Sequence, residues 1–208
     1  MLNSQLLKLS LRALFIAPLA VACSTPATVL DTSPWVRPSP GLQQRIERRA
    51  ARLPWTHGVE RLELVRWFAE IGEPAYEALL KLCQDPRPDV VGSALGALGA
   101  TGDATLIPVL HELPWPDAED VELRLERARA LLRLGDYSMV PHLIDGLGHD
   151  RLMVRALCAQ SLYAESHDRF GYLPGGEQEE RALAVERWRE WWASLATPGE
   201  RVARADTQ

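Results

Sequence analysis

Cysteine is scarce in this chain of 208 residues, which contains only Cys23, Cys83 and Cys158. Cys83 and Cys158 each lie in an apolar run with helical spacing, where a free cysteine packs as a small hydrophobic side chain. A disulfide between them is permitted in an exported protein. However, they lie more than two of the repeats described below apart, and repeats contact mainly their neighbours. We therefore expect Cys83 and Cys158 to be free thiols.

Long apolar runs are also missing. Near the amino terminus, Lys8 and Arg12 are followed by an apolar stretch of only ten residues, 13–22. A helix that spans a bilayer needs about 20 apolar residues. A basic start, a short apolar run and small residues at its end predict a secretory signal peptide over residues 1–22.

Motifs of catalysis and metal binding are absent from the sequence. It contains no His-Glu-x-x-His or Cys-x-x-Cys pattern, no Gly-x-Ser-x-Gly elbow and no phosphate-binding loop. The glycine-rich residues 92–102 lack both the lysine and the preceding strand of such a loop. We expect no catalytic residue, no metal and no cofactor, and we expect solvated helix ends for the scattered histidines (His57, His111, His142, His149 and His167).

Basic residues are also fewer than acidic residues. The formal net charge is −5, and removal of residues 1–22 takes away two bases and no acid, which makes it −7. A basic face is the usual mark of a nucleic-acid partner, so we expect none. The acidic balance also disfavours a polybasic attraction to anionic lipid.

A sequence pattern that occurs three times is the most informative feature of the chain. Gly72, Gly102 and Gly135 each precede a segment of similar pattern, at spacings of 30 and 33 residues. Self-similarity at this period indicates a stacked-repeat architecture. Each unit has room for one helix of about 12 residues, a turn, a second helix and another turn.

The apolar residues favour helices throughout and show no useful strand alternation. The first helix of each pair should begin near Val59, Asp89, Asp120 and Arg151, and Asp103 and Asp136 stand where the caps of second helices belong. We predict an all-α fold: a short α-solenoid of about four helix pairs over residues 41–197, closed by a capping helix over 177–195.

Residues 89–103, followed by Pro108 and Leu110, resemble the HEAT-like repeat of the phycobilisome-lyase type, and the similarity extends over about residues 58–165. The resemblance implies that the second helix of each pair lines the concave face. It also implies a structural ladder between units, in which arginines pair with acids; Arg61, Arg124 and Arg155 occupy that position and Val91 interrupts it. The family includes scaffolds, adaptors and a few lyase-type proteins.

The segment Ala20–Cys23 resembles a bacterial lipobox. The resemblance implies cleavage before Cys23 and a lipid on its sulfur; the alternative is a secreted protein cut near Ala22. Ser24 stands where an Asp would retain some lipoproteins at the inner membrane, so we expect an outer-membrane location facing the periplasm. The proline-rich residues 23–40 predict a tether.

Aromatic residues gather near the carboxyl end. The predicted capping helix carries Trp188 and Trp191, and the preceding loop carries Phe170 and Tyr172. These four residues close the last apolar face of the array, or they form an aromatic binding groove. We expect residues 198–208 to form a disordered tail.

A repeat array specifies a surface and not a reaction. The leading hypothesis is therefore a non-catalytic scaffold or adaptor, tethered to the membrane by its lipid, that binds a protein or peptide at the cell envelope. The alternative is a lyase-like enzyme or chaperone that uses a concave pocket of the solenoid, which would need converging polar groups.

Overall fold

The computed structural model describes residues 33–114 and 120–195, and every regular element in these ranges is helical. The predicted all-α fold is confirmed. Cys23, the predicted signal peptide and the predicted tail lie outside the described residues. The elements are α1 (Pro40–Arg52), η1 (Leu53–Trp55), α2 (Gly58–Ile71), η2 (Glu73–Ala75), α3 (Tyr76–Leu82), α4 (Pro88–Ala100), α5 (Leu106–Glu112), α6 (Val121–Arg133), η3 (Tyr137–Met139), α7 (Val140–Gly146), α8 (Leu152–Ser166) and α9 (Gln178–Ser194).

The helix boundaries follow from local chemistry. The helices α2, α4, α6 and α8 begin within one residue of the predicted starts. Gly72, Gly102 and Gly135, the repeated glycines, all have positive φ, which a side chain would strain. Asp103 and Asp136 each accept a hydrogen bond from the backbone N–H two residues on, at 3.0 Å, so they shape the turns before α5 and α7.

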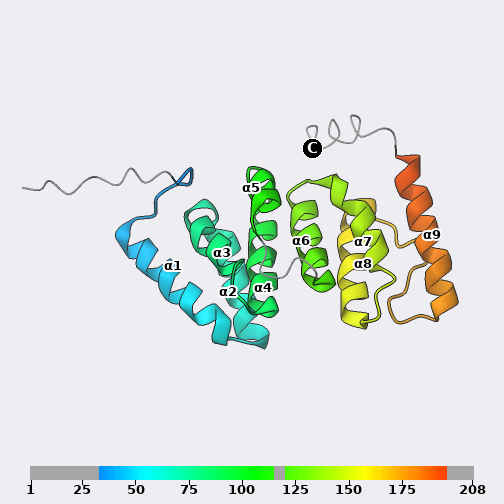
Figure 1. Ribbon diagram of the computed structural model, residues 1–208, viewed down its shortest axis with the longest axis horizontal. Helices are drawn as coiled ribbons and strands as arrows, with labels where there is room; N and C mark the ends of the chain where they lie inside the picture. The colour runs from blue at the N-terminus through cyan, green and yellow to red at the C-terminus, as the bar shows by residue number, and fades with distance from the viewer. Residues whose placement is uncertain (1–32, 115–119, 196–208) are drawn as a thin grey trace, which may run out of the picture. The chain divides into compact units, whose positions relative to one another are not determined.

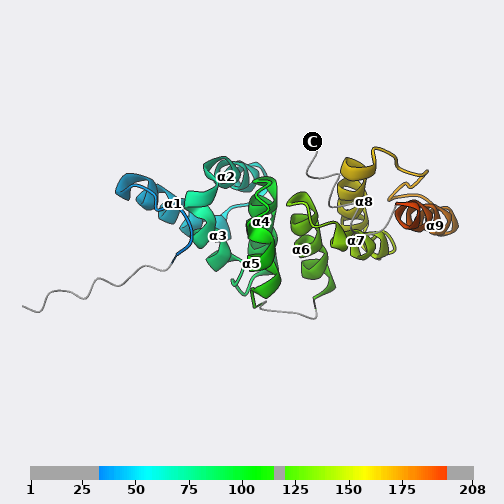
Figure 2. The same cartoon turned by 90° about the horizontal axis from the view of Figure 1, so that it is seen from above.

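The helices of residues 34–195 pack in chain order. α2 contacts α4, α4 contacts α6 and α6 contacts α8, while α3, α5 and α7 each pack against one or both of the neighbouring members of that series. Figures 1 and 2 show this succession from α1 at one end to α9 at the other. Helix α9 packs against α7.

The buried side chains form two apolar clusters that share α6. Leu123 and Leu131 of α6 belong to the cluster with α1–α5, whereas Leu125 and Leu132 belong to the cluster with α7–α9. Helix α6 therefore hides apolar surface on two sides and joins the halves of the core. Its contact with α4 is close, because a Cβ placed on Gly99 would lie 2.8 Å from the Cα of Ala130.

Residues 34–40, assigned above to the tether, pack on the domain. The ring of Trp35 meets that of Tyr76 edge to face with centroids 5.1 Å apart, and the Val36 N–H donates to Glu73 Oε1 at 3.1 Å. Pro34 is the first residue of the compact unit that contains the helices. Within the described ranges, no helix is both long and apolar enough to cross a membrane.

Candidate functional site

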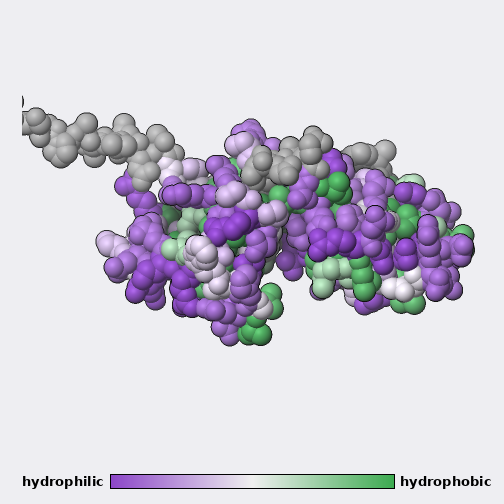
Figure 3. Space-filling view, turned by 60° about the horizontal axis from the view of Figure 1, so that its bottom comes forward, coloured by the Kyte–Doolittle hydropathy of each residue, from purple (hydrophilic) through white to green (hydrophobic). Residues whose placement is uncertain are grey.

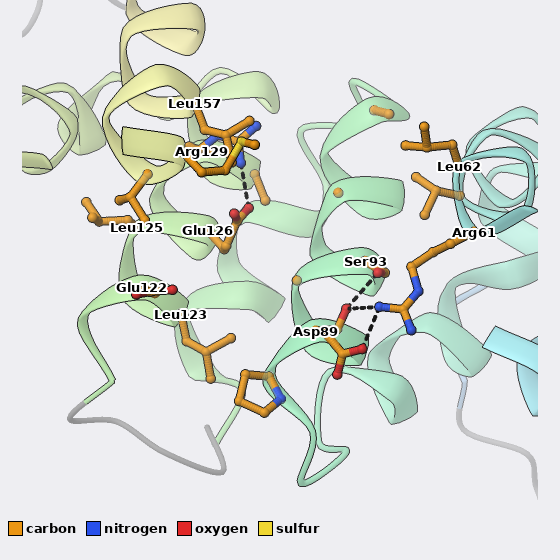
Figure 4. A pocket seen from close by; sticks show the side chains of 18 of the residues that line it. Arg61, Leu62, Asp89, Ser93, Glu122, Leu123, Leu125, Glu126, Arg129 and Leu157 are labelled. Carbon is orange, nitrogen blue, oxygen red and sulfur yellow. Dashed lines mark hydrogen bonds and ion pairs between the residues drawn. The ribbon is translucent and has the colours of Figure 1, made fainter. Parts of the chain in front are cut away.

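The main cavity of the described chain is a groove of about 990 Å³. Its lining residues come from α2, α4, α6 and α8 and the residues just before them (Figure 4). The described residues of α3, α5 and α7 contribute none. The groove therefore lies along the first helices of the predicted pairs, whereas the family resemblance placed the binding face on the second helices.

Small residues form the floor of the groove. Gly92, Ser93, Gly96 and Ala100 follow one another along one face of α4 at helical spacing, and all four line the cavity. A Cβ on Gly92 would meet Glu126 Cγ at 3.7 Å, while a Cβ on Gly96 would have nothing within 4 Å. The floor at Gly96 is therefore open space that a partner's side chains are able to fill.

Exposed apolar side chains stand on the two sides of this floor. Leu62 on α2 is 67% exposed and Met153 on α8 is 64% exposed, and both line the groove. Figure 3 shows apolar patches set in a largely hydrophilic face. Exposed Leu and Met beside a hollow are typical of a surface that binds a partner.

Ion pairs occupy the walls. Arg61 donates to Asp89 Oδ2 at 2.6 Å, Arg129 pairs with Glu126 at 2.7 Å, and Arg151 pairs with Glu122. Arg129 also donates to Ser161 Oγ at 3.2 Å, which ties α6 to α8. Burial raises the pKa of Glu126 above its ordinary value, although the charge of Arg129 acts in the opposite direction. The groove wall is thus poorly solvated at this pair.

The predicted arginine ladder is present only in part. Arg61 pairs with an acid of the next unit, as predicted. Arg155 is buried but donates to three backbone carbonyls, those of His149, Asp150 and Pro174, at 2.7–2.8 Å. Arg124 is exposed and lines a different cavity, on the other side of α6.

The two acids that pair with arginines between units share one position of the repeat, whereas their arginine partners do not. Asp89 and Glu122 are equivalent in the repeat frame, each two residues before the arginine position. Asp89 forms an ion pair with Arg61 of the preceding unit, and Glu122 forms one with Arg151 of the following unit. Arg151 was predicted only as the start of a helix, and its ion pair with Glu122 was not predicted.

Arg155 should stabilise the fold through its three carbonyl partners. Replacement by Met (Arg155→Met) leaves these acceptors without their charged donor, and we expect the free energy of unfolding to fall by about 2 kcal/mol. Arg124→Met on the exposed face of α6 is the matched control and should change it by less than about 0.5 kcal/mol. Urea unfolding of both variants measures this. Equal effects would contradict the assignment.

The Arg61–Asp89 pair should make stability depend on acidity. The hydrogen bond from Arg61 is the main reason that the pKa of Asp89 lies below its ordinary value of 3.8, and desolvation opposes it. Because the folded protein binds this proton less readily than the unfolded chain, the stabilisation is complete above the ordinary pKa. It is lost as the pH falls through the depressed one.

Urea unfolding at several pH values between 7 and 3 tests this dependence. The wild type should lose more stability below pH 4 than Arg61→Met, in which this carboxylate has lost its main hydrogen-bond donor. Parallel curves for the two proteins would show that the pair contributes nothing.

The aromatic residues of the carboxyl end form a packed cluster. Trp188 is 1% exposed, and its ring meets those of Phe170 and Trp191 with centroids 4.7 and 5.4 Å apart. Tyr172 is also buried, and its hydroxyl donates to the Leu147 carbonyl. Trp188 and Tyr172 border a cavity of only about 290 Å³. The four predicted binding residues are therefore brought together as a closing layer under α9, with little surface left for a partner.

The described cysteines and histidines do not converge on a reactive centre. Cys83 and Cys158 are free and buried, as predicted, and burial raises the pKa of each thiol to about 12. His111 pairs with Asp136 at 2.7 Å and, with His142 and His149, lines a second cavity of about 640 Å³. No group of three or more potential metal ligands occurs in the described part of the chain.

Comparison with family models and with curated proteins finds no match to this chain.

Proposed function

We propose that this protein is a non-catalytic interaction module, anchored by lipid at the bacterial cell envelope, that holds a protein partner in its groove. The observation that carries the proposal is the groove of about 990 Å³ with exposed Leu62 and Met153 on its two sides. The groove combines apolar side chains with a few charged groups, a lining typical of a site that binds a ligand or partner.

The domain in this proposal is a short HEAT-like α-solenoid. Support comes from the repeated glycines, from the regular starts of α2, α4, α6 and α8, and from the contacts of each of these helices with the next. The aromatic cluster under α9 fits the atypical cap that the end of such an array requires.

A lyase-like reaction has less support. The thiol is the common nucleophile for such chemistry, and it reacts as thiolate. With a pKa of about 12, Cys83 and Cys158 stay protonated at neutral pH. We therefore propose no reaction for the groove.

The proposed anchor is Cys23, and the target is the outer membrane, facing the periplasm. Because Pro34 already belongs to the domain, only ten residues lie between it and Cys23, and these eleven steps along the chain give a reach of about 34 Å at 3.1 Å per residue. The intact mass of the mature amino terminus and fractionation of Cys23→Ser test the anchor. An unmodified Cys23, or a variant that stays with the membrane, would contradict it.

A groove-filling variant tests the binding function. A Leu side chain at Gly96 enters open space in the groove, and one at Gly41 enters open space on α1, outside it. We expect a partner that co-purifies from solubilised membranes with the wild type and with Gly41→Leu to be lost with Gly96→Leu. Identical sets of co-purifying proteins for all three chains would overturn the proposal.

A further inference from the structure

We infer that the occupant of the groove is an amphipathic α-helix of the partner protein, with an acidic side chain placed against Arg133. This inference rests on the proposed function and specifies the partner's chemistry.

The polar groups of the groove favour a helix over an extended segment. The Ser93 hydroxyl already donates to the Asp89 carbonyl at 2.6 Å, and the floor otherwise offers glycine and alanine of a helix whose own backbone is paired. An extended peptide would bury N–H and C=O groups here without partners, which is costly. A helix satisfies its own backbone and presents only side chains to the groove.

The dimensions also suit a helix. The floor of Gly92, Ser93, Gly96 and Ala100 lets a second helix approach α4 closely, within the usual interaxial distance of about 8–10 Å. Helices α4 and α6 have 13 residues each, a length of about 20 Å. An occupant of three to four turns matches this length.

The charged side chains of the groove indicate where the charged side chains of the occupant lie. Four of its arginines pair with acids, whereas Arg133 is exposed and makes no ion pair with the described residues. At the opposite end, near the start of α6, three acids (Asp89, Asp120 and Glu122) face two arginines (Arg61 and Arg151). One end of the groove therefore has an excess of positive charge and the other an excess of negative charge.

The side-chain charges therefore favour an occupant that places an acidic side chain at Arg133 and a basic side chain near Asp120.

A display selection tests this inference on the full mature chain. Random 14-residue peptides are selected for binding to the wild type and against binding to Gly96→Leu, so that only groove binders survive. We expect apolar residues at positions i, i+3 or i+4 and i+7, together with an acidic residue. A central Pro in a recovered peptide should weaken binding at least tenfold.

Charge reversal tests the pairing of an acid with Arg133. Arg133→Glu should weaken binding of a recovered peptide about tenfold, and replacing the peptide's acid by Lys should restore it. Arg124→Glu makes the same change of charge on the other side of α6 and should have no such effect. Equal effects of the two reversals would overturn the assignment of Arg133.

Two outcomes separate this inference from the proposed function. The helical occupant is overturned if the recovered peptides tolerate Pro, or if no recovered peptide requires the open space at Gly96. The proposed function still holds in that case, provided that a partner co-purifies with the wild type and is lost with Gly96→Leu. If the co-purifying proteins do not change with Gly96→Leu, the function itself fails and this inference fails with it.

Discussion

Replacement of Trp188 by Ala should lower the free energy of unfolding by about 3–5 kcal/mol, the range for removal of a large aromatic side chain from a core. Trp188 is fully buried and contacts Phe170 and Trp191, and it belongs to the cluster that joins α9 to α7 and α8. Its loss leaves a cavity under α9 and exposes the last apolar face of the helical array.

Urea unfolding with Trp55→Ala as the control measures this effect. Trp55 is 77% exposed, so the same substitution there should cost less than about 1 kcal/mol. The Trp188 variant should also be cut faster within α9 by a protease. If the two variants unfold at the same urea concentration, α9 is not a stabilising cap.

Replacement of Gly99 by Leu should destabilise the protein by about 3 kcal/mol, at the upper end of the usual cost of overpacking. The Cα of Ala130 would lie 2.8 Å from the first atom of the new side chain, so α4 and α6 must separate. Because α6 joins the two apolar clusters, this separation disturbs the whole core.

The control, Gly96→Leu, makes the same change three residues away on the same helix. Nothing lies within 4 Å of a Cβ at Gly96, and Leu favours a helix over Gly by up to about 1 kcal/mol. We therefore expect Gly96→Leu to be as stable as the wild type or slightly more so. Thermal unfolding of both variants measures the difference, and equal melting temperatures would contradict the close contact of α4 with α6.

The sequence was sufficient for the helices and their order. Gly72, Gly102 and Gly135 predicted the turns that follow α2, α4 and α6, because the positive φ of each glycine is a local property. The buried thiols of Cys83 and Cys158 followed from the apolar runs around them.

The site was harder to predict, because it depends on how each helix is rotated about its axis. Successive residues of a helix point about 100° apart, so Arg124 and Glu122 lie on different sides of α6 although both are charged and close in sequence. The predicted ion pair between units therefore occurs at Arg61 and does not occur at Arg124, which lies on the other side of α6. No local sequence pattern predicts which helices line the larger cavity.

Long-range packing decided the remaining differences. Trp35 lies among prolines that predict an extended tether, yet its ring packs against that of Tyr76 on the domain. The sequence left Trp188 and Tyr172 open to two interpretations, a cap or a binding groove, whereas the structure buries both side chains where α9 packs against α7.

Site-specific photo-crosslinking in the cell tests the central claim most directly, namely that a protein partner occupies the groove of α2, α4, α6 and α8. A benzoyl-phenylalanine at Met153 lies at the groove, and one at Leu183 lies on α9 outside it; the two native side chains are 64% and 61% exposed. We predict a specific crosslink to one protein at Met153, mapped by mass spectrometry to a helical segment, and none at Leu183. The same crosslinks at both positions, or none at Met153, would contradict the claim.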